Sequence, residues 1–310
     1  MSATPKPRSD RSDHGPGPNA TDPTKTTTIR RQYAQRLRGR FAAINTEIRR
    51  AVRDRDFFGL SDDGAEQLAP QEPTPLQPYP FSRDDQKIER FEDWLDEQFD
   101  RGVLETISRG ENEYIRSAYN RGVTHADTQL NKAGVAVDEE TLDATFNRGV
   151  REKSLQRLYT RNYSALEGVT SETAKQISED ITSGFARGIN PRDMADAITG
   201  RMDAVGKTRG TTLARTETIN AHATATLDRY EALGTETVTI KAEWSSAGDN
   251  RVCPICGTLN GNVYTIKEAR TETFRYEAAG DDPDSLSGEY PVKPPAHPNC
   301  RCSILPVTNT

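Results

Sequence analysis

All four cysteines of this 310-residue chain lie at or beyond position 253, which constrains the fold more than any other feature of the sequence. They form two pairs, Cys253 with Cys256 and Cys300 with Cys302, and His297 precedes the second pair. A disulfide framework for a whole chain would be spread along it, so the clustering indicates a local site. A C-x2-C turn holds two thiolates close together, and a tetrahedral Zn2+ would join two such pairs across the loop between them.

These five candidate donors exceed the four that a tetrahedral zinc ion needs. We expect Cys253, Cys256 and Cys300 to bind the ion, with either His297 or Cys302 as the fourth ligand. Residues 300 and 302 would point to the same side of a strand. Such a site leaves no open position for a substrate, so the predicted cofactor is a structural Zn2+.

Two arginines adjoin the candidate ligands, Arg251 in the first half of the site and Arg301 in the second. A zinc ion bound by three or four thiolates is net negative, and we expect these side chains to offset that charge from outside the ligand set. The alternative is a group of reduced structural thiols with no metal.

The apolar content is too low for the whole chain to form one dense core. Hydrophobic residues make up 33% of the sequence, against roughly 45–50% apolar residues in compact soluble proteins. Residues 1–27 are predicted to be a disordered tail, and the proline-rich acidic stretch 61–82 an extended linker. The sequence shows neither a membrane span nor a secretory signal, so we expect a soluble chain not exported by the general route.

Helical periodicity fills most of the remainder up to Gly234. We predict a basic amphipathic helix over residues 28–60. Its buried stripe would consist of Tyr33, Leu37, Phe41, Ile44, Ile48 and Val52. Residues 83–206 form a predicted helical region with stripes over 88–107 and 114–130 and further helices over 139–161, 171–187 and 190–201. A long helix over 207–233 opens a predicted C-terminal domain, 207–310.

Beyond the long helix the sequence predicts short strands at 235–244, 262–266 and 302–307, with a long polar loop over 269–295. A domain with so few apolar residues has a small core, so we expect it to need a staple, that is, a bound metal that links its segments. The predicted fold class is therefore α+β, with a mainly α-helical, elongated N-terminal region and a small zinc-stapled α+β C-terminal domain.

Charge is divided unevenly along the chain. Residues 1–60 contain 13 basic and 6 acidic residues, whereas residues 61–150 contain 9 and 20. The basic helix carries Arg30, Arg31, Arg36, Arg38, Arg40, Arg49, Arg50, Arg53 and Arg55. These side chains would suit DNA phosphates or acidic protein surfaces. Because Tyr33 and Phe41 lie on the apolar stripe, where they would pack and not stack on bases, a protein partner is favoured.

Three runs in the last part of the chain resemble the phage head morphogenesis family, also called the Mu F-like minor head proteins. They are LARTETINAHATATLDRYEALG from Leu213, WSSAGDNRVCPICGTLNG from Trp244 and PPAHPNCRCSILP from Pro294, and the resemblance covers about residues 175–306. It implies a minor capsid protein of a tailed virus, made in the host cytoplasm and incorporated inside the head near the portal. Implied partners are the portal protein, the major capsid protein and, as a further possibility, packaged DNA. No membrane, small-molecule substrate or enzymatic activity is implied.

The resemblance also marks Arg215, Glu217, Trp244, Asp249 and Arg251, with Leu259 and Gly261, as motif positions of unassigned role. We expect Arg215 and Glu217 each to pair with a neighbouring element, Trp244 to lie in the core, and Asp249 to shape the turn before the first cysteine pair. His222 is expected to be a packing or surface residue. The rival functions are a metal-dependent hydrolase or nuclease using the Cys/His site, and a sequence-independent DNA-binding protein acting through the arginine-rich helix.

Overall fold

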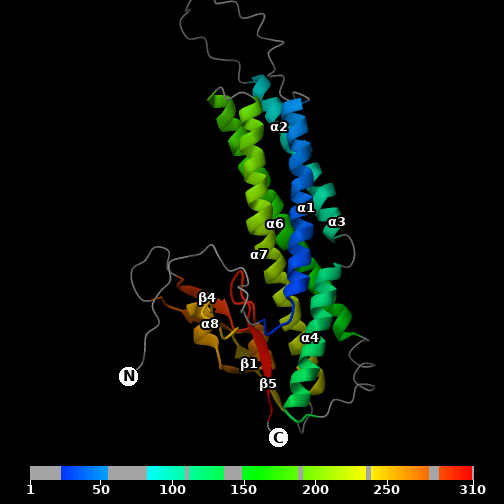
Figure 1. Cartoon of the computed structure of the whole chain (residues 1–310), viewed down its shortest axis with the longest axis vertical. Helices are drawn as coiled ribbons and strands as arrows, with labels where there is room; N and C mark the ends of the chain where they lie inside the picture. The colour runs from blue at the N-terminus through cyan, green and yellow to red at the C-terminus, as the bar shows by residue number, and fades with distance from the viewer. Residues whose placement is uncertain are drawn as a thin grey trace, which may run out of the picture. The chain divides into compact units, whose positions relative to one another are not determined.

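The computed structural model describes residues 22–54, 82–108, 112–135, 149–187, 191–234, 239–278 and 286–308 (Figure 1). These residues fall into two compact units built from segments far apart in the sequence. Unit 1 comprises Met1–Tyr33, Glu111–Thr160 and Thr212–Thr310, and unit 2 comprises Ala34–Gly110 and Arg161–Thr211. The domain boundaries expected from the sequence remain a prediction.

Helices dominate the described residues up to Leu233. They are α1 Thr27–Arg49, the π-helical turn η1 Arg50–Asp54, α2 Ser82–Phe99, η3 Asp100–Leu104, α3 Glu105–Ser108, α4 Glu113–Lys132, α6 Val150–Ala186 and α7 Pro191–Leu233. No helix in the described ranges combines the length and the apolar character needed to cross a membrane. The predicted linker at 61–81 and most of the predicted tail lie outside the described residues.

Residues 22–26, assigned to the tail from the sequence, belong to the fold of unit 1. Thr24 and Thr26 are buried, and the Asp22 carboxylate accepts hydrogen bonds from the backbone N–H groups of Thr24 (3.2 Å) and Thr27 (2.8 Å). Asp22 therefore satisfies a free donor at the start of α1. Composition alone indicated disorder because these buried residues are polar.

Two helix breaks expected from the sequence are absent from the described residues. The expected helices at 190–201 and 207–233 are one helix, α7. Two of its interior glycines face α1 within unit 2. A Cβ on Gly206 would lie 3.2 Å from the Phe41 Cβ, which is tighter than usual, whereas one on Gly210 would make an ordinary contact with the Leu37 Cβ at 3.4 Å. Gly206 therefore lets α1 approach α7 closely, and neither glycine ends the helix.

Helix α6 likewise runs without interruption where one break, between residues 161 and 171, was expected. The start of the helix predicted from residue 139 lies outside the described residues. The apolar stripe is interrupted there because polar residues are buried, namely Asn162, Thr170 and Thr173. Both threonine hydroxyls donate to carbonyls of their own helix, Thr173 to Val169 at 2.6 Å and Thr170 to Glu167 at 3.0 Å. These polar side chains can therefore be buried without interrupting the helix.

In unit 2, the predicted stripes of α1 and α2 form the core. Phe41 and Phe99 pack edge to face with ring centroids 6.2 Å apart, and the described apolar positions of both stripes from Leu37 and Phe91 onward are buried. Asn45 donates to the carbonyl of Thr199 at 3.1 Å, and Arg201 pairs with Asp180 at 2.8 Å. Helical periodicity therefore identified this core correctly.

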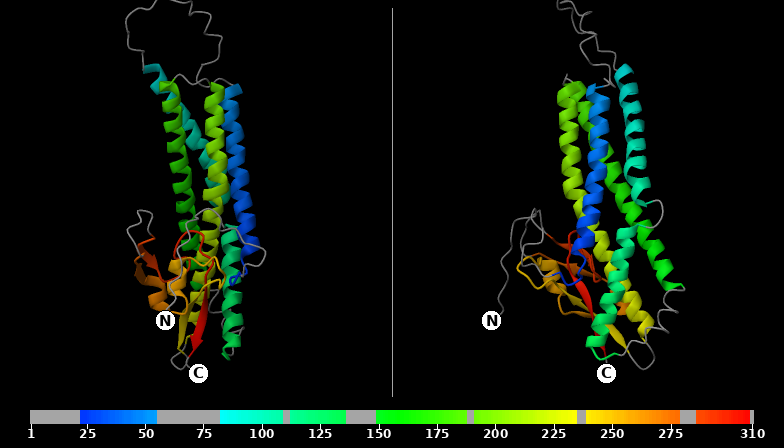
Figure 2. Two further views of the ribbon diagram at one scale, coloured as in Figure 1. Left: turned by 60° about the vertical axis from the view of Figure 1, so that its left-hand side comes forward. Right: turned by 45° about the vertical axis from the view of Figure 1, so that its right-hand side comes forward.

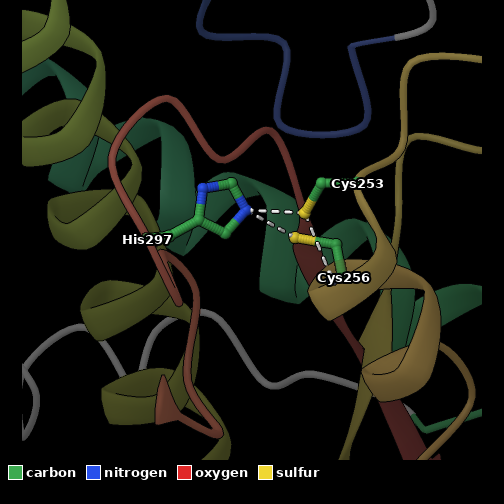
Figure 3. A group of neighbouring side chains, drawn as sticks. All are labelled: Cys253, Cys256 and His297. Atoms are coloured by element: carbon green, nitrogen blue, oxygen red, sulfur yellow. Dashed lines mark hydrogen bonds between the residues drawn. The ribbon is translucent and has the colours of Figure 1, made fainter. Parts of the chain in front are cut away.

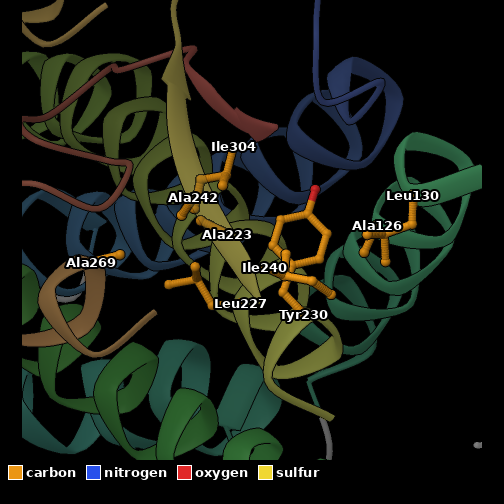
Figure 4. Packing of buried hydrophobic residues seen from close by; sticks show 9 residues of the cluster. All are labelled: Ala126, Leu130, Ala223, Leu227, Tyr230, Ile240, Ala242, Ala269 and Ile304. Atoms are coloured by element: carbon orange, nitrogen blue, oxygen red, sulfur yellow. The ribbon is translucent and has the colours of Figure 1, made fainter. Parts of the chain in front are cut away.

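In unit 1, the last part of α7 is surrounded by protein. Nearly every residue from Leu213 to Tyr230 is buried, and β5 (Ser303–Thr308) lies beside α4 in Figures 1 and 2. An antiparallel sheet in the order β2-β1-β5 packs there, with β1 at Ile240–Ser245 and β2 at Val263–Thr265. The core between α4, α7 and this sheet contains Ala126, Leu130, Ala223, Leu227, Tyr230, Ile240, Ala242, Ala269 and Ile304 (Figure 4). The predicted strands at 262–266 and 302–307 are confirmed, and so is the described part of the strand predicted at 235–244, since residues 235–238 lie outside the described residues.

The long loop predicted over 269–295 is wrong in part, because it contains regular structure. Helix α9 (Ile266–Thr271) enters it, and β3 (Thr273–Tyr276) pairs with β4 (Gly288–Pro291). Thr265 and Glu268 form a capping box that starts α9, and Phe274 and Tyr290 pack across the two strands with centroids 6.0 Å apart. The mostly helical N-terminal region and the small strand-containing C-terminal region together confirm the α+β class.

Candidate metal centre

The first half of the site is a knuckle at the start of a short helix, α8 (Pro254–Leu259). Cys253 is the N-cap, and its Sγ accepts a hydrogen bond from the backbone N–H of Cys256 at 3.4 Å. Pro254 stands in the first turn, where its missing N–H leaves no helical bond unmade. This local geometry places both sulfurs of the C-x2-C motif on one side of the turn.

The second half is a turn that leads into β5. The backbone N–H of Cys300 donates to the His297 carbonyl at 3.2 Å, and Asn299 has a left-handed φ of 67°. The Cys302 N–H donates to the Cys300 sulfur at 3.5 Å, much as in the first knuckle. The Asn299 side chain donates to the Thr212 hydroxyl at 3.3 Å, which fixes the turn on α7 within unit 1.

The fold brings all five predicted donors together. The Nε2 atom of His297 lies 2.9 Å from the Cys253 sulfur and 3.1 Å from the Cys256 sulfur (Figure 3). The sulfurs of Cys256 and Cys300 are 3.8 Å apart, close to the ligand spacing of about 3.8 Å that tetrahedral geometry gives for Zn–S bonds of about 2.3 Å. Cys253, Cys256 and His297 form one group and Cys256, Cys300 and Cys302 another, with donor atoms within 4.8 Å in each. This cluster has the donors to bind a metal ion.

The tautomer of His297 suits metal binding. Its Nδ1 lies 2.7 Å from the carbonyl oxygen of Pro298, which can only accept, so Nδ1 carries a proton. Nε2 then faces the sulfurs of Cys253 and Cys256. An anchored Nδ1–H is the usual way in which a protein orients a ligating imidazole.

Without a metal, the site favours thiolates at Cys253 and Cys300 beside a protonated His297. The hydrogen bond with Cys256 lowers the pKa of Cys253 to about 4, against the opposing effect of burial. Burial acts to lower the pKa of His297, but the hydrogen bond and charge of Cys253 outweigh it and raise the pKa to about 9. Contact with the Cys256 thiol also lowers the pKa of Cys300, whereas that of Cys256 is raised. A bound cation would take the place of the protons that these groups share.

An ion pair joins the two halves of the site. Arg301, which lies between two of the cysteines, donates to both carboxylate oxygens of Asp249 at 2.6 and 2.7 Å. Asp249 also accepts a hydrogen bond from the Arg251 backbone N–H at 3.1 Å, so it shapes the turn as predicted. The bond from Arg301 holds the pKa of Asp249 below its usual value.

The sequence that contains the candidate metal site matches a known protein family. Residues 175–305 match the family model described as Phage Mu protein F like protein. The chain has a Phage Mu F-like region. This match confirms the resemblance inferred from the sequence, and the family implies a phage head morphogenesis protein. Searches of curated proteins and of solved structures found no match to the chain.

Two further motif residues of the Mu F-like region, Trp244 and Gly261, lie in the core and in a turn. Trp244 is 1% exposed and packs with Ile255, Leu259 and the cysteines, as predicted for a core residue. Gly261 has a φ of 81° and donates to the Trp244 carbonyl at 2.8 Å, so the turn from Leu259 to Gly261, which leads from α8 into β2, is hydrogen-bonded to β1.

Buried charge lies on the α7 segment of the Mu F-like region. Arg215 and Glu217 are both buried, and His222 is buried at the packing face between α7 and α4. The sequence interpretation missed His125, whose Nε2 lies 3.1 Å from the Ile304 carbonyl and 3.2 Å from the Ser303 hydroxyl. No local pattern marks His125, because its partners lie far away in the sequence.

The arginines of α1 and η1, upstream of the Mu F-like region, do not all lie on one surface. Arg31, Arg36, Arg38, Arg49 and Arg50 are exposed and Arg40 is half-buried. Arg50 pairs with Glu47 at 2.7 Å, and Arg49 donates to the Thr199 hydroxyl at 3.3 Å. Arg30 differs, because it is buried and pairs with Asp22 at 3.0 Å. Arg55 and the side chain of Arg53 lie outside the described residues.

Proposed function

We propose that this chain is a structural minor head protein of a tailed virus, incorporated inside the head near the portal. The Mu F-like match over residues 175–305 carries this proposal, because the family implies a role in head morphogenesis. The portal protein and the major capsid protein are the proposed partners. A non-enzymatic role is supported by a donor cluster that has more protein ligands than a tetrahedral ion can use.

Localisation and assembly test the proposed role. In a density map of the intact particle, we expect the chain inside the head and next to the portal. Deleting the gene should give heads that assemble or package DNA abnormally, with rescue by the full-length chain. Particles that lack the chain and are nevertheless normal and infectious would contradict the proposal.

The proposed cofactor is a structural Zn2+ held by Cys253, Cys256, His297 and Cys300. His297 is favoured over Cys302 as the fourth ligand because its Nε2 lies within 3.1 Å of the sulfurs of both Cys253 and Cys256. Bound zinc would join two sequence segments and so stabilise a region that has a small core.

Metal analysis distinguishes the ligand sets. We expect purified protein to contain one zinc per chain, and the Co2+-substituted protein to show the visible spectrum of a tetrahedral site with three thiolates. His297→Ala should change that spectrum and weaken metal binding, whereas Cys302→Ser should retain both. The opposite pattern would make Cys302 the ligand, and protein that folds without any thiophilic metal would contradict the staple.

A hydrolase or nuclease built on the same site would respond differently to mutation. Cys256 belongs to both groups of donors, so we expect Cys256→Ser to destabilise unit 1 and release metal. If that variant stays folded and loses a measurable turnover, the structural role is wrong.

The exposed arginines of α1 form the proposed contact surface for an acidic patch on a head protein. Arg36 and Arg38 point to solvent, whereas the stripe residues Leu37 and Phe41 are buried in unit 2. We expect the double substitution of Arg36 and Arg38 to Glu to abolish binding to the portal or capsid protein while leaving the fold intact. Retained protein binding together with loss of a steeply salt-dependent DNA affinity would favour a DNA contact instead.

A further inference from the structure

Unit 2 contains a groove between α2 and α6. Its volume is about 770 Å³, and on the α6 side short side chains line it at successive turns of one helix face, among them Ser171, Ala174, Ser178 and Thr182. The α6 residues that line it extend from Ser171 to Ser183, which corresponds to about 18 Å along the helix axis. A groove of this length, with short side chains along it, suits a second helix laid into it.

The groove is acidic. Glu92 and Asp96 line it from α2 and Glu179 lines it from α6, against the single cation of Lys175. Burial raises the pKa of Asp96, and so do the charges of neighbouring carboxylates, with Asp100 first and Glu92 second. Negative charge therefore accumulates along this side of α2, and a cationic partner would reduce the repulsion.

The exposed side of α1 has the complementary character. Arg36 and Arg38 lie near one end of it and Arg49 at the other, and all three are exposed. The helix rises by about 20 Å between Arg36 and Arg49, which matches the length of the groove. The exposed residues between them are small, namely Gly39, Ala42, Ala43 and Thr46. This side of α1 therefore combines positive charge with side chains short enough for a groove.

Gly39 is a further sign that another helix approaches this side of α1. Glycine inside a helix is destabilising relative to alanine, so it usually has a packing reason. A Cβ on Gly39 would meet nothing within 4 Å, so no close contact within the chain requires glycine there. Gly206 shows the alternative within unit 2, since it lets α1 approach α7 closely. The contact that would explain Gly39 lies outside the single chain.

One copy of the chain cannot bring the two surfaces together. The buried side of α1 packs on α2 through Phe41 and Phe99, and on α7 through Asn45. Helix α6 packs on α7 through the pair between Arg201 and Asp180. In the left view of Figure 2, α1 and α6 accordingly lie on opposite sides of α7. The groove of one copy can therefore receive the exposed side of α1 only from another copy.

We propose that the groove between α2 and α6 of one copy binds the exposed side of α1 of a second copy. The inference rests on the proposed function and deepens it, since the second copy is then the head protein whose acidic patch receives the arginines of α1. Every copy has both surfaces, and the two differ, so the contact is head-to-tail and can repeat from copy to copy.

The test measures self-association of the full-length protein by sedimentation velocity over a concentration series, at low and high salt. The groove variant is Glu92→Arg with Asp96→Arg, and the helix variant is Arg36→Glu with Arg38→Glu. The matched control makes the same change of charge at two exposed positions of α2 that do not line the groove, Glu89→Arg with Asp93→Arg.

We expect the wild type to associate reversibly, and less at high salt. The groove variant and the helix variant should each associate at least about 10-fold more weakly, because like charges then face each other. An equimolar mixture of these two variants should regain the association of the wild type, since the natural surfaces meet each other and so do the reversed ones. The control should match the wild type.

Gly39→Leu tests the contact without changing charge. A side chain there meets open space within the chain, so the variant should fold, but it should associate at least about 10-fold more weakly because leucine would hold the second copy away. A wild type that stays monomeric, a mixture that does not recover, a control as weak as the groove variant, or a Gly39→Leu protein that associates normally would each overturn the inference.

Failure of this inference can be distinguished from failure of the proposed function. A monomeric wild type whose helix variant loses binding to the portal or capsid protein would refute self-association and leave the proposed function standing. A helix variant that loses self-association but still binds those proteins would support the inference and refute their proposed contact with the arginines of α1.

Discussion

At the scale of single residues, unit 1 depends on side chains that are buried in one protonation state. His222 is the clearest case, since both ring nitrogens are buried with no hydrogen-bond partner among the described residues, and the His125 ring lies 5.0 Å away. The five donors of the candidate site were predictable because their spacing in the sequence reflects ligand geometry. The role of His125 was not, because its partners Ser303 and Ile304 lie far away in the sequence.

His222 should make unit 1 less stable in acid. Burial, followed by the charge of His125, lowers its pKa to about 3 from an ordinary value of 6.5. In acid the unfolded chain therefore binds a proton on this side chain that the folded chain does not bind. The contribution of His222 to stability is fully present above about pH 6.5, and the free energy of unfolding falls by about 2 kcal/mol by pH 5. We expect urea unfolding at pH 7.5 and pH 5 to show this loss in the wild type. His222→Leu should reduce the difference, and an equal pH dependence in both proteins would contradict it.

The pair between Asp249 and Arg301 should contribute more than an exposed ion pair. Their side chains are 16% and 9% exposed, so Asp249→Asn leaves a largely buried guanidinium without its carboxylate. We expect a loss of about 3 kcal/mol in the free energy of unfolding. Glu277→Gln removes the partner of Arg275 from a pair that is mostly exposed, and should cost less than about 0.5 kcal/mol. Equal losses in both variants would refute this difference.

At the scale of elements, glycines determine how closely the helices pack. The sequence predicted most buried positions of the helices, because a repeated apolar stripe is a local signal. It failed for the continuity of α6 and α7, where buried polar residues and glycines occur at contacts that only the folded chain reveals. Gly122 on α4 is the tightest contact of this kind among the described glycines of unit 1, because an added Cβ would overlap the backbone oxygen of His222.

Substituting Gly122 should therefore separate α4 from α7. We expect Gly122→Ala to lower the free energy of unfolding by at least about 2 kcal/mol, since the neighbouring atom is backbone and cannot turn away. The matched control is Gly168→Ala on α6, where an added Cβ meets nothing within 4 Å and helix propensity should add about 0.5–1 kcal/mol. Thermal unfolding of both variants checks the prediction, and a stable Gly122→Ala would show that the helices are less closely packed.

At the scale of the whole molecule, the two compact units should respond differently to loss of metal. The donors all belong to unit 1, whereas unit 2 has its own core around Phe41, Leu95 and Phe99. We expect chelation to increase hydrogen exchange in the Mu F-like part of unit 1, and to leave the core amides of unit 2 much less affected. A uniform increase across both units would show that they unfold together.

Unit 1 combines segments that lie far apart in the sequence, Met1–Tyr33 and Thr212–Thr310, and this fixes the order of events during synthesis. The residues around Asp22 leave the ribosome long before Cys300 and the strand that follows it. Unit 1 can therefore be completed only after the second cysteine pair has emerged. A chain terminated before Cys300 would lack the second half of the candidate metal site, and its Mu F-like region would stay incomplete.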